Sequence, residues 1–349
     1  MKKLLTLSLT LIGVSQALEL RAEPLGKLNL SGALTGYVIY SDNKTDNKKT
    51  RYDIGSAIIN LSKPAEPLGF TLYAGAYAMP VIGAPLLKTS NYTDLFSPLP
   101  IAYLELAPTK GFSLQAGKLP TLIGYESAFT YLNNYLQRGL IWNMQPVVHN
   151  GVRVIYTADL FTVKAGINDG FYTLSTKNPK PALEASITLT PAKEASVSLN
   201  MLVPDKDAKP NDTANPSNRR EFNIVSSYTI DRLSLGFDLM YVYAPKSSTA
   251  GVLQEAKASG GCIHLSYDLK PFKLSGRLEY VKDNSDAGGI DLVGLGNGNK
   301  GWSITFTPAY TKGSLFARTE FSYVKADRNF TTNGKKEQAR IGIEVGFLF

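Results

Sequence analysis

Hydrophobic and polar side chains alternate along short segments of this chain from residue 27 to the last residue. In the segment 161–167, for example, apolar side chains at odd positions alternate with Thr162, Lys164 and a glycine. A period of two residues is typical of β-strands whose two faces meet different surroundings. The pattern predicts an all-β protein with about 16 strands, at residues 27–40, 52–61, 70–79, 101–106, 112–117, 148–156, 161–167, 183–189, 195–201, 222–228, 233–243, 263–267, 272–281, 302–307, 315–325 and 340–349.

Tight turns and long polar connections alternate between these predicted strands. Turns such as 63–67 and 190–193 alternate with connections such as 204–220 and 283–300, which are rich in Gly, Asn, Asp and Ser. Short turns at one end and long loops at the other are typical of bacterial outer-membrane barrels. A secreted β-sandwich or β-helix would explain the alternation but not this asymmetry. We therefore predict one transmembrane antiparallel up-and-down β-barrel domain over residues 18–349.

Composition is compatible with a barrel and not with a helical membrane protein. The mean hydropathy is −0.09, and no run approaches the roughly 18 apolar residues of a spanning helix. A barrel strand needs only about 9–11 residues, of which half face the lumen. The 19 Tyr, 15 Phe and 2 Trp residues would supply the aromatic girdles of such a barrel, although a β-sandwich is also rich in Tyr.

The first residues have the pattern of a secretory signal peptide. Lys2 and Lys3 form a charged start, residues 4–14 are apolar, and small residues precede a cleavage point after Ala17. The apolar run is too short to span a membrane. We expect removal of residues 1–17, with cleavage after Ala22 and a buried N-terminal helix as alternatives. Export places the protein in the outer membrane of a Gram-negative bacterium.

The sequence offers little support for catalysis, metal binding or nucleic-acid binding. The net charge is +8, but bases are scattered among acids with no basic helix. Two His and one Cys make a zinc site unexpected. The run 296–301 matches G-x-G-x-x-G but lacks the following helix that a nucleotide site needs. There is no G-x-S-x-G motif, so we expect no enzyme, metal or cofactor, with a lipase that lacks this motif as an alternative.

Charged residues of both signs share the polar face of the predicted strands. Facing lipid they would be costly, so we expect them to line a water-filled lumen, where their near balance argues against strong ion selectivity. Leu235, Phe237 and Leu239 are predicted to face lipid. The wall candidates are Glu105, Arg153, Lys164, Glu184, Glu194, Asp238, Lys273, Arg277, Glu279, Arg318, Glu320, Arg340 and Glu344.

The connection at residues 119–145 differs from the other long connections because it is rich in aromatic and aliphatic side chains. Tyr131 and Tyr135 are spaced i, i+4, which favours a short helix. So apolar a segment needs a surface to pack against. We predict that it folds inward as the constriction, where Glu126 and Arg138 would oppose each other and meet wall groups such as Arg153 or Glu105. Packing at the rim or against a neighbouring subunit is the alternative.

A run of motif residues spans this region and the strands on either side of it. Its members are Gly117, Lys118, Thr121, Gly124, Glu126, Arg138, Gly139, Pro146, His149, Gly151, Arg153 and the loop Asn168, Asp169 and Gly170. This run resembles the OmpL-like β-barrel porin family of Gram-negative outer membranes. Gln137 stands where the family commonly has serine, and Asn150 where it commonly has threonine. The resemblance implies a β-barrel porin without fixing its substrate.

The chain ends on an aromatic residue, Phe349, at the end of an alternating strand. Such an end resembles the signal by which the barrel-assembly machinery recognises its substrates. Together these features predict an outer-membrane porin for passive diffusion of small hydrophilic solutes and ions. An outer-membrane receptor or adhesin that binds through its long loops is the alternative. The expected partners are outer-membrane lipid, the solutes, the assembly machinery and, in a homo-oligomer, further copies of the chain.

Overall fold

The computed structural model describes residues 17–46, 48–171, 180–209, 216–285 and 289–349. The predicted signal peptide lies almost wholly outside these residues. In the described part, sixteen strands form the barrel: β2 (Gly26–Ser41), β3 (Thr50–Lys63), β4 (Leu68–Tyr77), β5 (Ile101–Thr109), β6 (Phe112–Pro120), β7 (Val148–Thr157), β8 (Phe161–Asn168), β9 (Ala182–Ala192), β10 (Ala195–Val203), β11 (Arg220–Ile230), β12 (Leu233–Ala244), β13 (Ala256–Leu269), β14 (Phe272–Asp283), β15 (Lys300–Lys312), β16 (Leu315–Ala326) and β17 (Glu337–Leu348).

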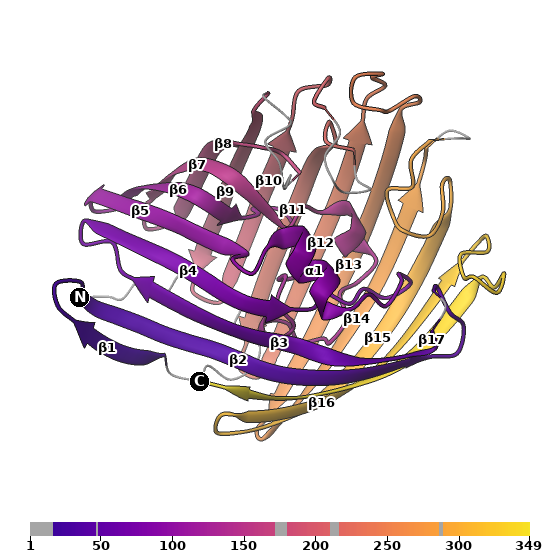
Figure 1. The fold of residues 1–349 in the computed structure, drawn as a ribbon, viewed down its shortest axis with the longest axis horizontal. Coiled ribbons are helices and arrows are strands. Elements are labelled where there is room, and N and C mark those ends of the chain that lie inside the picture. Colours follow the sequence, from indigo (N-terminus) through magenta and orange to yellow (C-terminus); the bar gives the residue numbers. More distant parts are fainter. Residues whose placement is uncertain (1–16, 47, 172–179, 210–215, 286–288) are drawn as a thin grey trace.

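The sheet closes on itself. Each barrel strand pairs antiparallel with the next, and β17 pairs with β2. Closure leaves no free sheet edge facing lipid, as a spanning β-structure requires. Figure 1 shows the strands around a common interior, with the long connections at one end and β1 (Leu18–Ala22) and the C-terminus at the other. The predicted fold class and strand number are confirmed.

Strand β1 and helix α1 (Thr89–Phe96), both within the described residues, were not predicted. Strand β1 folds back on β2 and pairs with Gly26–Leu30. It occupies the edge of β2 just beyond the chain end, where Phe349 exchanges two backbone hydrogen bonds with Gly32, of 2.8 and 3.1 Å. The connection from β4 to β5 carries α1, which packs against β3 and β4. No helix among the described residues is both long and apolar enough to cross a bilayer.

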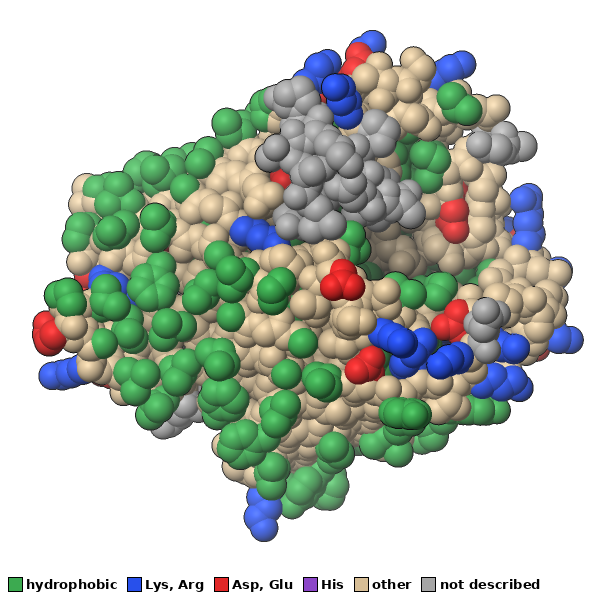
Figure 2. Space-filling model, viewed as in Figure 1, with side chains coloured by type: hydrophobic (Ala, Val, Ile, Leu, Met, Phe, Trp, Pro, Cys, Tyr) green, Lys and Arg blue, Asp and Glu red, His purple; other side chains and the backbone are tan. Residues whose placement is uncertain are grey.

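Alternation sorts side chains between the two faces of the barrel wall. On β12, Phe237 and Leu239 are 42% and 52% exposed, whereas Asp238 is fully buried. Large apolar side chains cover much of the outer surface in Figure 2, and charged ones gather mostly near its ends. The predicted register of β12 is therefore correct. Glu194 is the exception among the wall candidates, because it lies exposed in the turn between β9 and β10.

We predict that Leu239→Arg lowers the free energy of unfolding in lipid vesicles by about 2–4 kcal/mol, the cost of an arginine facing lipid near the midplane. Leu239 lies near the middle of β12 on the outer face. Reversible urea unfolding in vesicles measures the change, with Leu239→Ala as the control for lost side-chain volume. A loss no larger than that of the alanine variant would contradict a lipid-facing position.

Candidate functional site

Buried charged side chains cluster on the inner face of the strands that close the barrel. They come from β14, β16 and β17 and include both signs. Their neighbours along each strand are exposed apolar residues of the outer face, so these groups point into the barrel. Each of them is at most 4% exposed: Arg277, Glu279, Arg318, Glu320, Arg340 and Glu344.

The long segment, residues 121–147, joins β6 to β7 and contacts this charged wall. It holds two short 3₁₀ helices, Thr130–Leu132 and Ile141–Met144. The helix expected from the spacing of Tyr131 and Tyr135 is absent. The backbone N–H groups of this segment bind side chains of the wall instead of carbonyl oxygens in a preceding helical turn. Leu136 N, for example, donates to Glu320 Oε2 at 2.7 Å.

Wall carboxylates accept hydrogen bonds from the backbone of the long segment at three further points. Asp238 of β12 accepts from Tyr125 N at 2.9 Å. Glu279 of β14 accepts from Ile141 N at 3.2 Å, and Glu320 also accepts from Gln137 N at 3.2 Å. Buried backbone N–H groups need partners, and charged acceptors provide strong ones.

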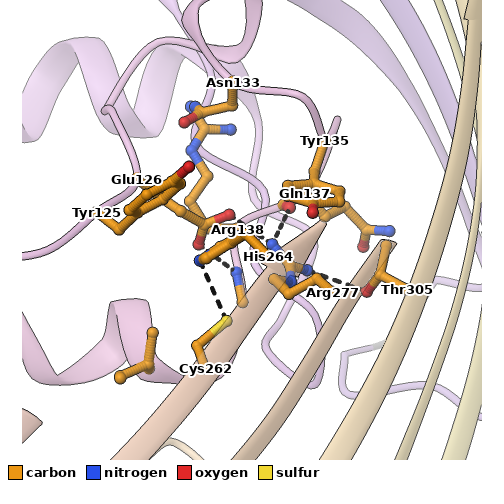
Figure 3. Close-up of polar contacts among 12 residues, drawn as sticks. Tyr125, Glu126, Asn133, Tyr135, Gln137, Arg138, Cys262, His264, Arg277 and Thr305 are labelled. Atoms are coloured by element: carbon orange, nitrogen blue, oxygen red, sulfur yellow. Dashed lines mark hydrogen bonds and ion pairs between the residues drawn. The ribbon is translucent and has the colours of Figure 1, made fainter. Parts of the chain in front are cut away.

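Wall arginines bind the carbonyl oxygens and the single buried acid of the segment. Arg318 donates to the carbonyls of Asn133 and Thr130 at 2.7 and 2.9 Å. Figure 3 shows Arg277 of β14 pointing at Glu126, with which it forms a 2.5 Å ion pair, and donating to the carbonyl oxygen of Gln137. The segment is thus bound to the wall by charge-assisted hydrogen bonds of both polarities.

Glu126 meets a base of the wall, as predicted, but that base is Arg277 and not Arg153, which was given as an example. The prediction that Arg138 opposes Glu126 and meets a wall group such as Glu105 is wrong. Arg138 is fully buried and donates to three carbonyls of its own segment, those of Ser127, Ala128 and Leu136. A guanidinium has five N–H donors, and here a folded-back loop supplies the acceptors. Arg138 therefore braces the segment and does not face Glu126 across an open gap.

The remaining candidates on β5 to β9 form a separate group. Arg153 of β7 forms a buried ion pair with Glu184 of β9 at 2.7 Å. Glu105 of β5 is half-buried and accepts from Gln115 of β6 at 3.1 Å. Lys164 of β8 is also half-buried. None of these contacts involves the long segment, so this part of the inner wall has polar groups that still reach solvent.

Two close contacts could not be read from the sequence. An added Cβ at Gly139 would lie 1.9 Å from Glu279 Oε1, so a larger residue there would force the Glu279 side chain to move. His264 stacks on Tyr125 with ring centroids 4.1 Å apart, and its Nε2 lies 3.1 Å from Cys262 Sγ. Glu279 is far from Gly139 in the sequence, and Tyr125 is far from His264, so residue type alone could not indicate these two contacts.

The connection between β4 and β5 also meets the long segment and the charged wall. Ile82 N donates to the carbonyl of Arg138 at 3.0 Å, and Arg138 N donates to that of Pro80 at 2.8 Å. Arg340 of β17 donates to the carbonyl of Val81 at 2.8 Å and to Gln137 Oε1 at 3.0 Å. Two connections and the wall therefore form one continuous hydrogen-bonded unit.

Comparison with known proteins gives one family and many similar folds. The family profile described as "Putative beta-barrel porin-2, OmpL-like" matches residues 27–349. No curated protein sequence matches the chain. Among solved structures, the outer membrane channel DcaP of Acinetobacter baumannii has a TM-score of 0.64 at 18% identity, with 93% of this chain and 97% of that chain covered.

Two further solved structures share this architecture. The outer-membrane protein OmpT of Vibrio cholerae has a TM-score of 0.63 at 15% identity, over 95% of this chain and 100% of that chain. An anion-selective porin from Comamonas acidovorans has a TM-score of 0.61 at 11% identity, over 92% and 99% of the two chains. At these identities the likeness concerns the fold.

Proposed function

This chain belongs to the OmpL-like β-barrel porin family, and we propose that its long segment lies inside the barrel as the constriction of a diffusion pore. The protein is an outer-membrane porin for passive diffusion. Small hydrophilic solutes and ions would cross beside the segment, and no bond in the solute would be made or broken.

The observation that carries this proposal is the one-sided attachment of the segment. Its charged contacts are with β12, β14, β16 and β17, whereas Glu105 and Lys164 on the other side of the wall remain half-buried. A path along β5 to β9 would then be lined by one acid and one base. Opposite charges on a narrow aqueous path create a transverse field that orients solutes, with weak net preference for either sign of ion.

Reconstitution in planar bilayers tests the proposal. We expect stepwise conductance, a reversal potential close to zero in a salt gradient, and vesicle swelling with small sugars or amino acids. Heat-modifiable mobility on gels serves as the control for a folded barrel. Folded protein that adds no conductance would contradict the pore, and a reversal potential near the limit for one ion would contradict the balanced lining.

Assembly is proposed to depend on Phe349 through the barrel-assembly machinery. The ring of Phe349 stacks on that of Phe347, with the ring centroids 6.2 Å apart, just after the closing strand. We expect deletion of Phe349 to lower the amount of folded barrel in the outer membrane. Quantifying the heat-modifiable form in membranes measures this, with deletion of the two C-terminal residues as a more severe comparison. Unchanged folded protein in both variants would contradict the signal.

A further inference from the structure

Five bases form a row on the outer face of the barrel, at the end that carries the long connections. Four of them lie on four adjacent strands, β13 to β16, which run side by side in Figure 1. Lys282 is directly opposite Lys300 in the sheet, and Lys325 is opposite Trp302. We call Arg220, Lys257, Lys282, Lys300 and Lys325 the basic row.

The row lies on the lipid-facing side of the wall and not in the lumen. Lys282 has the same parity as Leu278 and Tyr280, which are 51% and 50% exposed. Lys300 likewise has the parity of Trp302 and Ile304. Each lysine is therefore the outward side chain of its strand that lies nearest to the long connection.

Aromatic side chains lie directly beneath the row. Tyr280 is opposite Trp302 in the sheet, and the Trp302 ring lies 5.5 Å from that of Tyr323. Exposed Trp and Tyr on a barrel mark the level where hydrocarbon meets headgroups. One residue pair further along the strands, the lysines are therefore at headgroup level, and long connections place this end on the outer side of the membrane.

Acids of the chain neutralise the basic row only in part. Lys257 pairs with Glu255 at 2.6 Å and Lys300 with Asp327 at 3.2 Å, both at exposed positions where such pairs are weak. The hydrogen bond from Lys257 lowers the pKa of Glu255, which keeps that acid charged. Glu337 is opposite Lys325 in the sheet but accepts from the Tyr323 hydroxyl.

Lys282 has no ion pair with any described residue, and its direct neighbour across the strand pair is another base, Lys300. Like charges directly opposite in a sheet are destabilising. Arg220 adds a further base whose buried Nε has no hydrogen-bond partner among the described residues. Folding of the chain alone therefore leaves an excess of positive charge at this level.

We propose that the basic row binds the phosphate groups of a multiply phosphorylated lipid headgroup in the outer leaflet. Lysine ammonium groups are point-charge donors to phosphate. Strands β13 to β16 cover three strand spacings, or about 14 Å, which is wide enough to engage more than one phosphate of the same headgroup. The acyl chains of that lipid would lie below, against Tyr280, Ile304 and their exposed neighbours.

Lipid retention by the purified full-length barrel tests this proposal. Native mass spectrometry from detergent would compare a bisphosphorylated lipid A with its dephosphorylated form, for wild type and Lys282→Gln/Lys300→Gln. We expect preferential retention of the phosphorylated lipid, and a loss of affinity of about tenfold or more in the double variant. Lys312→Gln, at the other end of β15, is the matched control and should bind as wild type.

Three outcomes would overturn the proposal. The first is equal retention of both lipids by wild type, and the second is unchanged retention by the double variant with a folded barrel. In the third, inorganic pyrophosphate raises the melting temperature of wild type as much as the lipid does. That result would indicate a site for free anions rather than for a lipid headgroup. Conductance is not part of this test, so it remains decisive whether or not the pore proposal holds.

Discussion

Replacing residues 126–140 with a short Gly-Ser linker is expected to raise single-channel conductance several-fold while the barrel stays folded. The strand pairing that closes the barrel does not involve these residues. Their removal would free the inner faces of β14 and β16, where Arg277, Arg318 and Glu320 would then be hydrated by water in a wider lumen. Water would replace the hydrogen bonds that these charged side chains lose, so the barrel is expected to stay folded without the segment.

The excision is measured by bilayer recordings beside heat-modifiable mobility. A similar linker in place of residues 331–334 is the control, because that connection forms hydrogen bonds to Asn43 and Lys44 at the rim. The control should conduct as wild type. Wild-type conductance from a folded barrel without residues 126–140 would show that the long segment is not the constriction and would favour its packing at the rim.

Arg277→Ala is expected to release the long segment from the wall. Arg277 is fully buried between Glu126 of the segment and Glu279 of its own strand, at 2.5 and 3.3 Å. Removing one partner of a buried ion pair costs about 3–5 kcal/mol, because it leaves a charge without compensation. The strand ladders remain intact, so this cost is relieved most easily by detachment of the segment.

The expected signs of release are noisy open-channel current and protease cleavage within residues 121–147. Arg153→Ala is the matched control, since Arg153 pairs with Glu184 within the wall and should not expose the segment to protease. Adding Glu126→Gln to Arg277→Ala removes one orphaned carboxylate and should restore part of the protection. Protection equal to wild type in Arg277→Ala would refute the role of this pair.

The strands could be predicted because each carries its own signal. Alternation and turn residues lie within a few positions of one another, so the parity of Asp238 and Leu239 follows from the local sequence. Strand β1 was missed because its five residues adjoin the apolar run of the expected signal peptide. The helix α1 was missed because its residues read as an ordinary polar loop.

The contacts of the long segment could not be predicted, because they depend on where the closed wall places distant side chains. The sequence marked Glu126 as a charge in an apolar stretch, which is correct. It could not reveal that Arg277, rather than Arg153, lies opposite. For Arg138 the acceptors are carbonyl oxygens of the neighbouring backbone. The identity of the side chains in a sequence does not show which carbonyl oxygens a folded loop will bring to an arginine.

The attachment of the long segment also fixes an order of events in folding. Thr130 Oγ1 donates to Glu344 across 214 positions of the chain, and Arg318 reaches back to Thr130 across 188. Contacts between such distant positions form only after the intervening chain has been brought together. The wall that holds the segment includes β17, whose pairing with β2 closes the barrel, so the segment cannot reach its final position in a partly built sheet. Attachment of the long segment to the wall is therefore expected to follow closure of the barrel, and protection of residues 121–147 from protease would report on completed barrels alone.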